Sequence, residues 1–249
     1  MAPERVYGLH AVRALLSRAP QRVHKLWLQQ GRHDPRAAEL EALARSAQRP
    51  IERADGARLR GWLGDVAHQG VMAEIEALPP LREDDFYARL AESPEALILA
   101  LDGVQDPHNL GACLRSADAC GVLAVVVPRD RAAPLSAAAR KVAAGAAEST
   151  PVVTVTNLAR SLRLIKEAGL WIVGADAGAT LPASGVDLTG GRCLVLGAEG
   201  AGMRELTRRS CDWLVSLPAL GAVESLNVSV AAGMLLYEAV RQRQASRPK

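Results

Sequence analysis

The 249-residue sequence contains no apolar run long enough to cross a lipid bilayer. Its longest uncharged apolar runs, Ala96–Leu101 and Val122–Val127, are far shorter than the roughly 20 residues that a transmembrane helix needs. The first residues are polar and charged and lack the continuous apolar segment of a secretory signal. These absences predict a cytoplasmic protein that makes no use of a membrane.

Cysteine is scarce as well. No two of the four cysteines form a C-x-x-C pair, and no histidine stands at the spacing of a zinc finger. The sequence therefore predicts neither a metal site nor a disulfide framework. The four residues, expected to be buried thiols, are Cys113, Cys120, Cys193 and Cys211.

Aromatic residues make up only 3% of the chain, with a single phenylalanine, Phe86. Such a chain is not built as a platform on which nucleobases stack. Charge is nearly balanced, with a net charge of +3. The whole excess of positive charge lies before Ala77, in a segment with 12 basic and 9 acidic residues. Two explanations of this excess of three positive charges remain open. The N-terminal third contacts phosphate groups, or the charges are distributed unevenly along the chain by chance.

What the sequence does contain is an ordinary globular composition, with 49% apolar and 23% charged residues. A Pro-Pro pair followed by a charge run, in residues 77–85, predicts a linker between two compact units. We therefore place an N-terminal domain at residues 1–77, a linker at 78–95 and a C-terminal domain at 96–249.

Both domains are predicted to be α/β. Upstream of the linker, helix-like periodicity alternates with two short strand-like runs. Downstream, strand-like runs alternate with helical patterns, and a long helix is expected from about Leu226 to Arg243. This alternation predicts a parallel sheet with helices on both faces. The downstream strand-like runs are Leu97–Leu101, Leu123–Val127, Val152–Val155, Leu170–Val173, Cys193–Leu196 and Trp213–Leu217.

Ligands of open α/β sheets bind beyond the carboxyl ends of the strands, and three polar loops follow predicted strands. The first runs through Asp106-Pro-His-Asn109 into a helix that contains Arg115. Taken alone, Asn109 is readily explained as a helix cap. Arg115 stands in an otherwise small and apolar helix, so it is either a charge on the solvent face or a planar fork of donors for a phosphate.

The second loop opens from a strand into glycines at positions 197, 200 and 202. Their spacing fits neither the dinucleotide-binding fingerprint nor a phosphate-binding Walker loop. The glycines let a ligand approach bare backbone, with Glu199 as the one charged side chain, although a plain glycine turn has the same composition.

The third loop runs from Leu217 into the final helix. Ser225 is a good N-cap for that helix, and Asn227 would lie in its first turn. Capping alone explains each of these two residues, so the specificity of the pattern comes from the order and spacing of all three loops.

Together, the three loops resemble the three motifs of the SpoU family, also called TrmH-like, within the SPOUT superfamily of RNA 2′-O-ribose methyltransferases. The resemblance covers residues 96–243. It implies a deep trefoil knot, S-adenosylmethionine bound in the knot, and a homodimer whose active site forms at the subunit interface. The motif positions with implied catalytic roles are Asn109, Arg115, Glu199, Ser225 and Asn227. The positions implied to bind the cofactor through backbone are Gly197, Leu217 and Leu226.

Two N-terminal segments, Tyr7–Leu16 and His68–Val71, resemble the opening and closing segments of a small L30e-like RNA-binding domain. Such a domain is found in the bacterial family member that methylates a guanosine in the peptidyl-transferase region of 23S rRNA, and the tail Glu238–Arg243 resembles that of the same enzyme. The implied partner is 23S rRNA or a large-subunit assembly intermediate, not DNA. Alternatives are a relative acting on tRNA or another rRNA site, a non-catalytic ribosome-assembly factor and, from the strand pattern alone, a dinucleotide oxidoreductase.

The resemblance gives Arg115 a part in activating the ribose hydroxyl. A guanidinium with a pKa above about 12 is a poor proton acceptor. We therefore expect Arg115 to grip the adjacent phosphate and polarise the hydroxyl, while that phosphate or water takes the proton. Asn109 and Glu199 would orient Arg115 or the ribose, and Ser225 and Asn227 would shape the loop. Arginines expected to help choose the RNA are Arg5, Arg13, Arg22 and Arg32.

Overall fold

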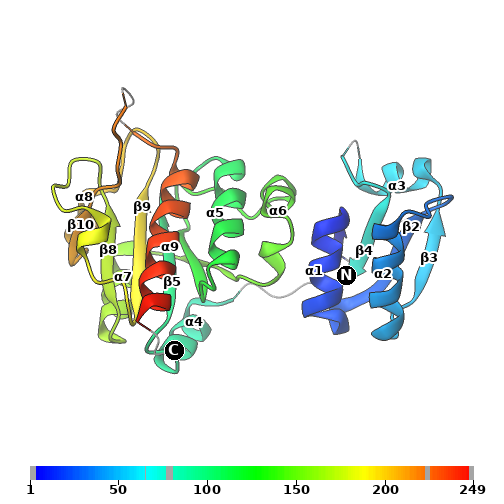
Figure 1. Ribbon diagram of the computed structural model, residues 1–249, viewed down its shortest axis with the longest axis horizontal. Coiled ribbons are helices and arrows are strands. Elements are labelled where there is room, and N and C mark those ends of the chain that lie inside the picture. The colour runs from blue at the N-terminus through cyan, green and yellow to red at the C-terminus, as the bar shows by residue number, and fades with distance from the viewer. Residues whose placement is uncertain (1–3, 65, 77–80, 222–224, 247–249) are drawn as a thin grey trace. The chain divides into compact units, whose positions relative to one another are not determined.

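The computed structural model describes residues 4–64, 66–76, 81–221 and 225–246. Two compact units make up the chain (Figure 1). The N-terminal unit reaches to Pro79 and includes the segment Ala144–Ser149, and the C-terminal unit holds the rest. The domain boundary expected between residues 77 and 78 lies outside the described residues.

The N-terminal unit is built on a four-stranded sheet in the order β1-β4-β2-β3. β4 runs antiparallel to both β1 and β2, whereas β2 and β3 are parallel. The strands are β1 (Glu4–Tyr7), β2 (Val23–Gln29), β3 (Ile51–Ala54) and β4 (Val71–Ile75). The helices are α1 (Leu9–Arg18), α2 (Pro35–Ser46) and α3 (Gly56–Leu63), with the short turns η1 (Pro20–Arg22) and η2 (Ala146–Glu148).

Apolar side chains fill both faces of this sheet. The larger cluster joins α1 and α2 to the strands and includes the fully buried Val12, Leu26 and Leu40. The smaller cluster lies under α3, where Leu59 packs with Trp27 of β2. The alternation of side chains along a strand places these two sets on opposite faces.

The two N-terminal segments singled out in the sequence lie side by side in this unit. Gly8 N–H donates to Val71 O at 3.1 Å, and Leu9 N–H donates to the Gln69 side-chain oxygen at 3.1 Å. Gly8 at the N-cap of α1 has no side chain that could accept this bond, so Gln69 satisfies one of the free N–H groups of the first turn. The pairing of these segments closes the unit at the start of α1.

The C-terminal unit carries a six-stranded sheet in the order β10-β8-β9-β5-β6-β7, and every strand pair in it is parallel. The strands are β5 (Leu97–Asp102), β6 (Ala124–Pro128), β7 (Val152–Val155), β8 (Trp171–Ala175), β9 (Arg192–Gly197) and β10 (Trp213–Val215). Each matches one of the six predicted runs, although the last strand ends at Val215 instead of Leu217. The predicted α/β class with a parallel sheet is confirmed, and the knot stays a prediction.

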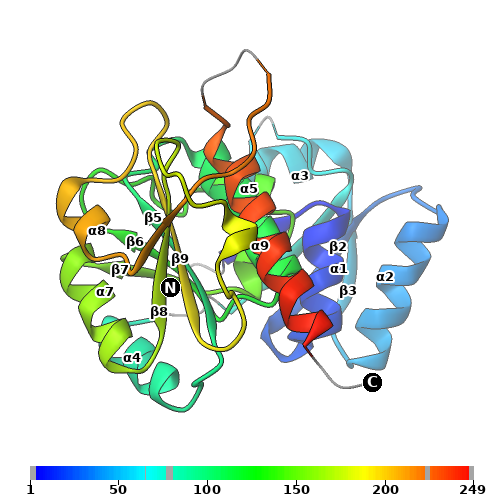
Figure 2. The same cartoon turned by 60° about the vertical axis from the view of Figure 1, so that its left-hand side comes forward.

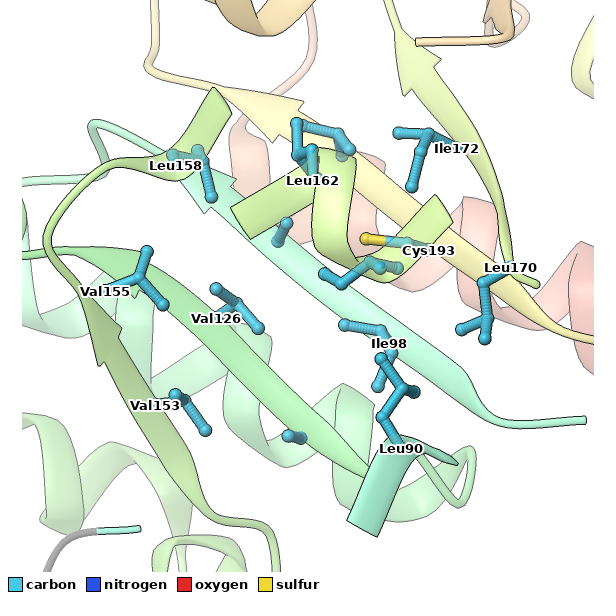
Figure 3. Packing of buried hydrophobic residues seen from close by; sticks show 14 of the residues in the cluster. Leu90, Ile98, Val126, Val153, Val155, Leu158, Leu162, Leu170, Ile172 and Cys193 are labelled. Carbon is cyan, nitrogen blue, oxygen red and sulfur yellow. The ribbon is translucent and has the colours of Figure 1, made fainter. Parts of the chain in front are cut away.

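Helices cover both faces of the six-stranded sheet. The described helices are α4 (Glu83–Ala91), α5 (Pro107–Ala119), α6 (Ala137–Ala143), α7 (Leu158–Glu167), α8 (Glu205–Arg209) and α9 (Val228–Ala245), with the short η3 (Ala183–Gly185). On one face, Leu90 of α4 and Leu162 of α7 pack over Ile98, Val126 and Cys193 of the central strands (Figure 3). α5 and α9 lie against each other on the opposite face (Figure 2).

The stretch expected to be a linker holds a helix in the described part, residues 81–95. Phe86 and Leu90 of α4 are fully buried in the core of the C-terminal unit. Their spacing of four residues sets both on one face of the helix. In the sequence, the charged residues around them made this shared apolar face hard to recognise. Residues 81–95 therefore belong to the C-terminal unit.

The charged tail of α9 fixes the surface loops beside it. Gln242 accepts a hydrogen bond from Leu188 N–H at 2.8 Å and donates one to Val186 O at 3.1 Å. Arg243 donates to Glu95 O at 3.0 Å and also bonds Gly190 O. These side chains thus satisfy backbone carbonyls that would otherwise need water.

Across the described ranges of the chain, no helix combines the length and the apolar character that crossing a membrane requires.

Candidate functional site

A cavity of about 420 Å³ lies at the carboxyl end of the six-stranded sheet. β9 and β5 are neighbours there, with Gly197 at the end of β9 in register with Asp102 at the end of β5. The chain leaves these two adjacent strands on different routes, which is the place where ligands bind in open α/β sheets. Five of the predicted residues line the cavity, and they are Gly197, Glu199, Leu217, Ser225 and Leu226.

Three predicted polar residues from three separate segments meet at the edge of this cavity: Asn109 in the first turn of α5, Glu199 in the loop after β9 and Asn227 at the N-cap of α9. Glu199 Oε1 accepts a hydrogen bond from Asn109 Nδ2 at 3.3 Å and a shorter one from Asn227 Nδ2. Asn227 Nδ2 also donates to Asn109 Oδ1 at 3.0 Å. These residues lie 118 positions apart at their extremes, and only the sheet topology brings them together.

The N-terminus of α9 supports the same carboxylate. Val228 N–H, in the first turn of the helix, donates to Glu199 Oε1 at 3.3 Å. A negative charge is favourable at that end of a helix because the first N–H groups and the helix dipole point toward it. Oε1 of Glu199 thus accepts all of these hydrogen bonds. Among the residues described, no protein group donates to its other oxygen, Oε2.

The caps of the two site helices differ from the expectation. Asp106, not Asn109, caps α5 by accepting a hydrogen bond from His108 N–H at 3.0 Å. Asn227, not Ser225, caps α9, with its Oδ1 accepting from Ser229 N–H at 2.9 Å. The predicted start of the last helix at Leu226 was two residues early. Because Asp106 serves as the cap of α5, the amide of Asn109 is available to Glu199.

The glycine loop is held by its own backbone. Ala198 and Gly202 exchange two hydrogen bonds of 3.1 and 2.9 Å. A Cβ at Gly197 would lie 2.0 Å from the carbonyl carbon of Gly202 and 2.1 Å from Met203 N, so the fold itself requires a glycine there. Gly200 has a φ of +74° and open space around it. The interpretation that glycine admits a ligand therefore suits Gly200, whereas Gly197 is required by packing.

A buried carboxylate anchors the far end of this loop. Asp102 is 1% exposed and accepts hydrogen bonds from Arg204 N–H at 2.8 Å and Arg204 Nε at 2.6 Å. A charge this deep is tolerated because its partner is ionic and several donors reach it. The pair ties the end of β5 to the residue that precedes α8.

Asp176 is a residue of the cavity that the motif search missed. It follows β8 at the carboxyl edge of the sheet and lines the cavity. Arg208 Nε at 2.7 Å and Gly178 N–H at 2.9 Å hold its two oxygens. The hydrogen bond from Arg208 lowers the pKa of Asp176 below its ordinary value, so this carboxylate is charged at neutral pH. Its position directly after a predicted strand was the signal that could have found it.

Two predicted residues stand apart from the polar cluster. Arg115 is exposed on α5, does not line the cavity and makes no ion pair within the described part of the chain. Six residues separate it from Asn109, which turns it to another side of the same helix. Ser225 lines the cavity but contributes no hydrogen bond to the cluster.

The cysteines and the potential metal ligands of the described residues are scattered through the fold and form no cluster of three or more. All four cysteines are free, with Cys113 and Cys193 buried and Cys120 and Cys211 half-buried. Burial raises the pKa of Cys113 and of Cys211 to about 12, which keeps both as neutral thiols. No group of three or more potential metal-ligating side chains occurs in the described ranges.

The arrangement suits an organic ligand that is partly apolar and partly cationic or hydroxylated. Leu196, Leu217 and Val228 supply apolar walls, while Asp176 and Glu199 place two carboxylates at the cavity. Cavities of roughly 300–1,000 Å³ with few polar groups are typical of cofactor sites. Carboxylates accept hydrogen bonds from ribose hydroxyls and attract ammonium or sulfonium groups.

Two family models match the chain. Residues 96–237 match the SpoU rRNA Methylase family, and residues 5–81 match the RNA 2′-O ribose methyltransferase substrate-binding family.

Curated relatives match along nearly the whole chain. A 23S rRNA (guanosine-2′-O-)-methyltransferase RlmB of Pseudomonas putida is 51% identical, covering 98% of this chain and 98% of the relative. The protein of the same name from Escherichia coli is 49% identical, covering 96% of this chain and 99% of the relative.

Solved structures agree with this likeness. The SpoU methyltransferase AviRb from Streptomyces viridochromogenes, in complex with the cofactor AdoMet, superposes with a TM-score of 0.77 at 25% identity, covering 98% of this chain and 92% of that one. An RNA 2′-O ribose methyltransferase superposes with a TM-score of 0.74 at 26% identity, covering 96% and 88%.

Proposed function

Because the chain belongs to the SpoU rRNA methylase family, we propose that it transfers a methyl group from S-adenosylmethionine to the ribose 2′-hydroxyl of a guanosine in 23S rRNA. The target nucleotide is in the peptidyl-transferase region, and the reaction takes place in the cytoplasm, where that RNA is assembled. The observation that carries the proposal is the meeting of Asn109, Glu199 and Asn227 at the edge of one cavity.

The cavity has the shape and chemistry that this cofactor requires. The bare backbone around Gly200 and the apolar side chains of Leu217 and Leu226 suit the flat adenine ring, while Asp176 can accept from the ribose hydroxyls. When bound, S-adenosylmethionine supplies a methyl group made electrophilic by the positive sulfur. The carboxylate of Glu199 would contribute negative charge to the cavity that holds this cationic group, and Val228 N–H helps to fix the orientation of the carboxylate.

The chain's own residues must position the 2′-hydroxyl and assist the loss of its proton. Arg115 offers a planar fork of donors that can grip the neighbouring phosphate and polarise the hydroxyl. The phosphate oxygen or a water then accepts the proton, since the guanidinium stays charged. Asn109 and Asn227 hold Glu199 in one orientation, which fixes where the ribose can lie.

We propose a homodimer, because a second subunit would account for the position of Arg115 away from the cavity of its own chain. The exposed side of α9 carries Val230, 50% exposed, and Tyr237, 66% exposed, and their spacing of seven residues sets them on one side of the helix. Large apolar side chains of this kind suit contact with a second copy. α9 packs against α5, the helix that carries Arg115, so we place Arg115 in this contact, where it would serve the cavity of the other subunit.

The N-terminal unit would select the RNA. It matches the substrate-binding family model over residues 5–81, and its residues up to Glu76 include all of the chain's net positive charge. Phosphate contacts by such residues supply affinity, while the cavity of the other unit supplies the chemistry.

Transfer of labelled methyl from S-adenosylmethionine to equal amounts of unmodified 23S rRNA, 16S rRNA and tRNA tests the proposal. Digestion to nucleosides then identifies the product. We expect label in 2′-O-methylguanosine from 23S rRNA alone. Label in tRNA or 16S rRNA would overturn the substrate. Absence of label from free 23S rRNA and from large-subunit assembly intermediates alike would overturn the enzymatic function.

A further inference from the structure

Two of the chain's four tryptophans pack together in the N-terminal unit. Trp27 of β2, 6% exposed, and the half-buried Trp62 in the last turn of α3 have ring centroids 4.7 Å apart at an interplanar angle of 66°. This edge-on arrangement is a favourable one for indole rings. The other two tryptophans, Trp171 and Trp213, pack together in the C-terminal unit.

Three cationic side chains lie over these two rings. Arg58 Cζ is 4.8 Å from the centroid of Trp62 and 5.7 Å from that of Trp27. Arg5 Cζ lies 5.6 Å from Trp62, and Lys25 Nζ lies 5.1 Å from Trp27. All are within the roughly 6 Å at which a cation is attracted to the face of a ring. We call these five residues the tryptophan–arginine surface.

The two arginines of this surface differ from others of the same unit in their partners. Arg13, Arg32 and Arg53 each pair with a carboxylate. Arg5 and Arg58 are exposed, and within the described ranges neither makes an ion pair. Arg5 instead donates to Trp62 O at 3.2 Å.

The acidic side chains near this surface either already have a hydrogen-bonding partner or lie next to only part of the surface. Glu52 pairs with Lys25 at 2.5 Å, and the Asp55 side chain accepts from the Arg58 backbone N–H at 2.7 Å. Glu74 lies across from Arg5 on β4 without forming an ion pair. Two guanidinium groups are therefore held in place by rings, and no carboxylate of residues 4–64 or 66–76 forms an ion pair with them.

We propose that the tryptophan–arginine surface binds the phosphate backbone of the RNA substrate through Arg5 and Arg58. A guanidinium held against an indole keeps its outward N–H groups for an anion and has lost part of its side-chain freedom already. The occupant is RNA because the whole surface lies within the residues that match the substrate-binding family model. The inference rests on the proposed function and adds to it the surface of the N-terminal unit that contacts RNA.

The test compares Arg58→Gln, Arg5→Gln and the double variant with Arg45→Gln in the full-length protein. Arg45 is an exposed arginine on α2, which packs against the opposite face of the same sheet. Affinity for a 23S rRNA fragment is measured over a series of salt concentrations, and affinity for S-adenosylmethionine is measured alongside. Each single variant should bind RNA roughly tenfold more weakly, as for loss of a charged hydrogen bond. The slope of log affinity against log salt should fall by about one per arginine removed.

A second pair of variants separates contact from folding. Arg58→Lys keeps the charge without the planar fork, and Trp62→Phe keeps a ring with less surface. Both should weaken RNA binding less than Arg58→Gln, while circular dichroism and S-adenosylmethionine affinity stay at the wild-type value.

Three outcomes would overturn the inference. RNA affinity and salt slope could be unchanged in the double variant, or Arg45→Gln could weaken binding equally. Methylation of assembling particles could fall while affinity for free RNA stays constant, which would assign the surface to a ribosomal protein. Because S-adenosylmethionine binding and methyl transfer by the wild type are measured alongside, failure of the proposed function is seen separately.

Discussion

The two units of this protein present their functional groups in opposite ways. In the six-stranded unit, side chains from three separate segments converge at the carboxyl edge of a parallel sheet, and Glu199 is held by Asn109, Asn227 and Val228 N–H. In the four-stranded unit, Arg5 and Arg58 are exposed and held by rings, and neither pairs with an acidic residue in the part of the chain that the structure describes. The first arrangement fixes reacting groups relative to one another, and the second leaves charge available to a large polyanion.

This difference implies a division of effects that substitutions can test. Apart from Arg115, which would itself contact an RNA phosphate, changes at the six-stranded unit should alter methyl transfer or cofactor affinity and leave RNA affinity alone. Changes at the tryptophan–arginine surface should do the reverse. Four substitutions in the six-stranded unit, one of them matched to Gly61 in the four-stranded unit, test this division from the largest expected effect to the smallest.

Replacing Arg115 should have the largest effect. Arg115→Ala removes the fork that would grip the phosphate beside the reacting hydroxyl, and we expect kcat to fall by about 10²–10³-fold, as for loss of one preorganised donor. Affinity for S-adenosylmethionine should stay constant because Arg115 does not line the cavity. Single-turnover methylation of 23S rRNA, with Arg163→Ala on α7 as the control, checks this. Full activity of Arg115→Ala would remove Arg115 from the mechanism.

A matched pair of glycines, one from each unit, gives the next largest contrast. The Cβ of Gly197→Ala would overlap the backbone of Gly202, and we expect a loss of about 1–3 kcal/mol in unfolding free energy together with weaker cofactor binding. A Cβ at Gly61 in α3 meets nothing within 4 Å. Gly61→Ala should stabilise that helix by about 0.5–1 kcal/mol. Urea unfolding of both variants measures the contrast, and equal responses would contradict the packing argument.

The two units differ in how much of their fold and of their functional groups the sequence predicts. The six strands and the meeting of Asn109, Glu199 and Asn227 followed from strand alternation and motif resemblance. The caps did not, because Asp106 and Asn227 compete with Asn109 and Ser225 as equally good capping residues, and only backbone geometry decides among them.

The aromatic contacts of the N-terminal unit were hidden for a different reason. A low aromatic content argued against a stacking surface, yet Trp27 and Trp62 are 35 positions apart and meet only when α3 packs on β2. Composition averages over the whole chain and cannot report such a local concentration. α4 was missed in the same way, because the charge run around Phe86 and Leu90 outweighed their shared face.

Asp176 provides a test of intermediate size. Asp176→Asn keeps the shape of the side chain but removes its charge, and we expect roughly tenfold weaker binding of S-adenosylmethionine, as for loss of one charged hydrogen bond. RNA affinity should not change. Asp187→Asn is the control, because Asp187 is also a carboxylate of lowered pKa but does not line the cavity. Isothermal titration with the cofactor measures both, and an equal loss in the control would refute a cavity-specific role.

Glu238, at the tail of α9, provides the smallest test. Hydrogen bonds from Arg241 and Gln242 lower its pKa to about 2, against an ordinary value of 4.5. Its stabilising contribution is therefore fully present above pH 4.5 and is lost as pH falls toward 2.

The variant Glu238→Gln isolates this contribution. It should be less stable than the wild type by under about 1 kcal/mol at pH 7, since the pair is near the surface, and the gap should narrow at pH 3. Urea unfolding at both values measures it. The difference in unfolding free energy arises in the six-stranded unit. If the four-stranded unit unfolds in a separate transition, the midpoint of that transition should be the same in both proteins. A gap that widens at low pH would mean that Glu238 is stabilised in its protonated form, contrary to its contacts with Arg241.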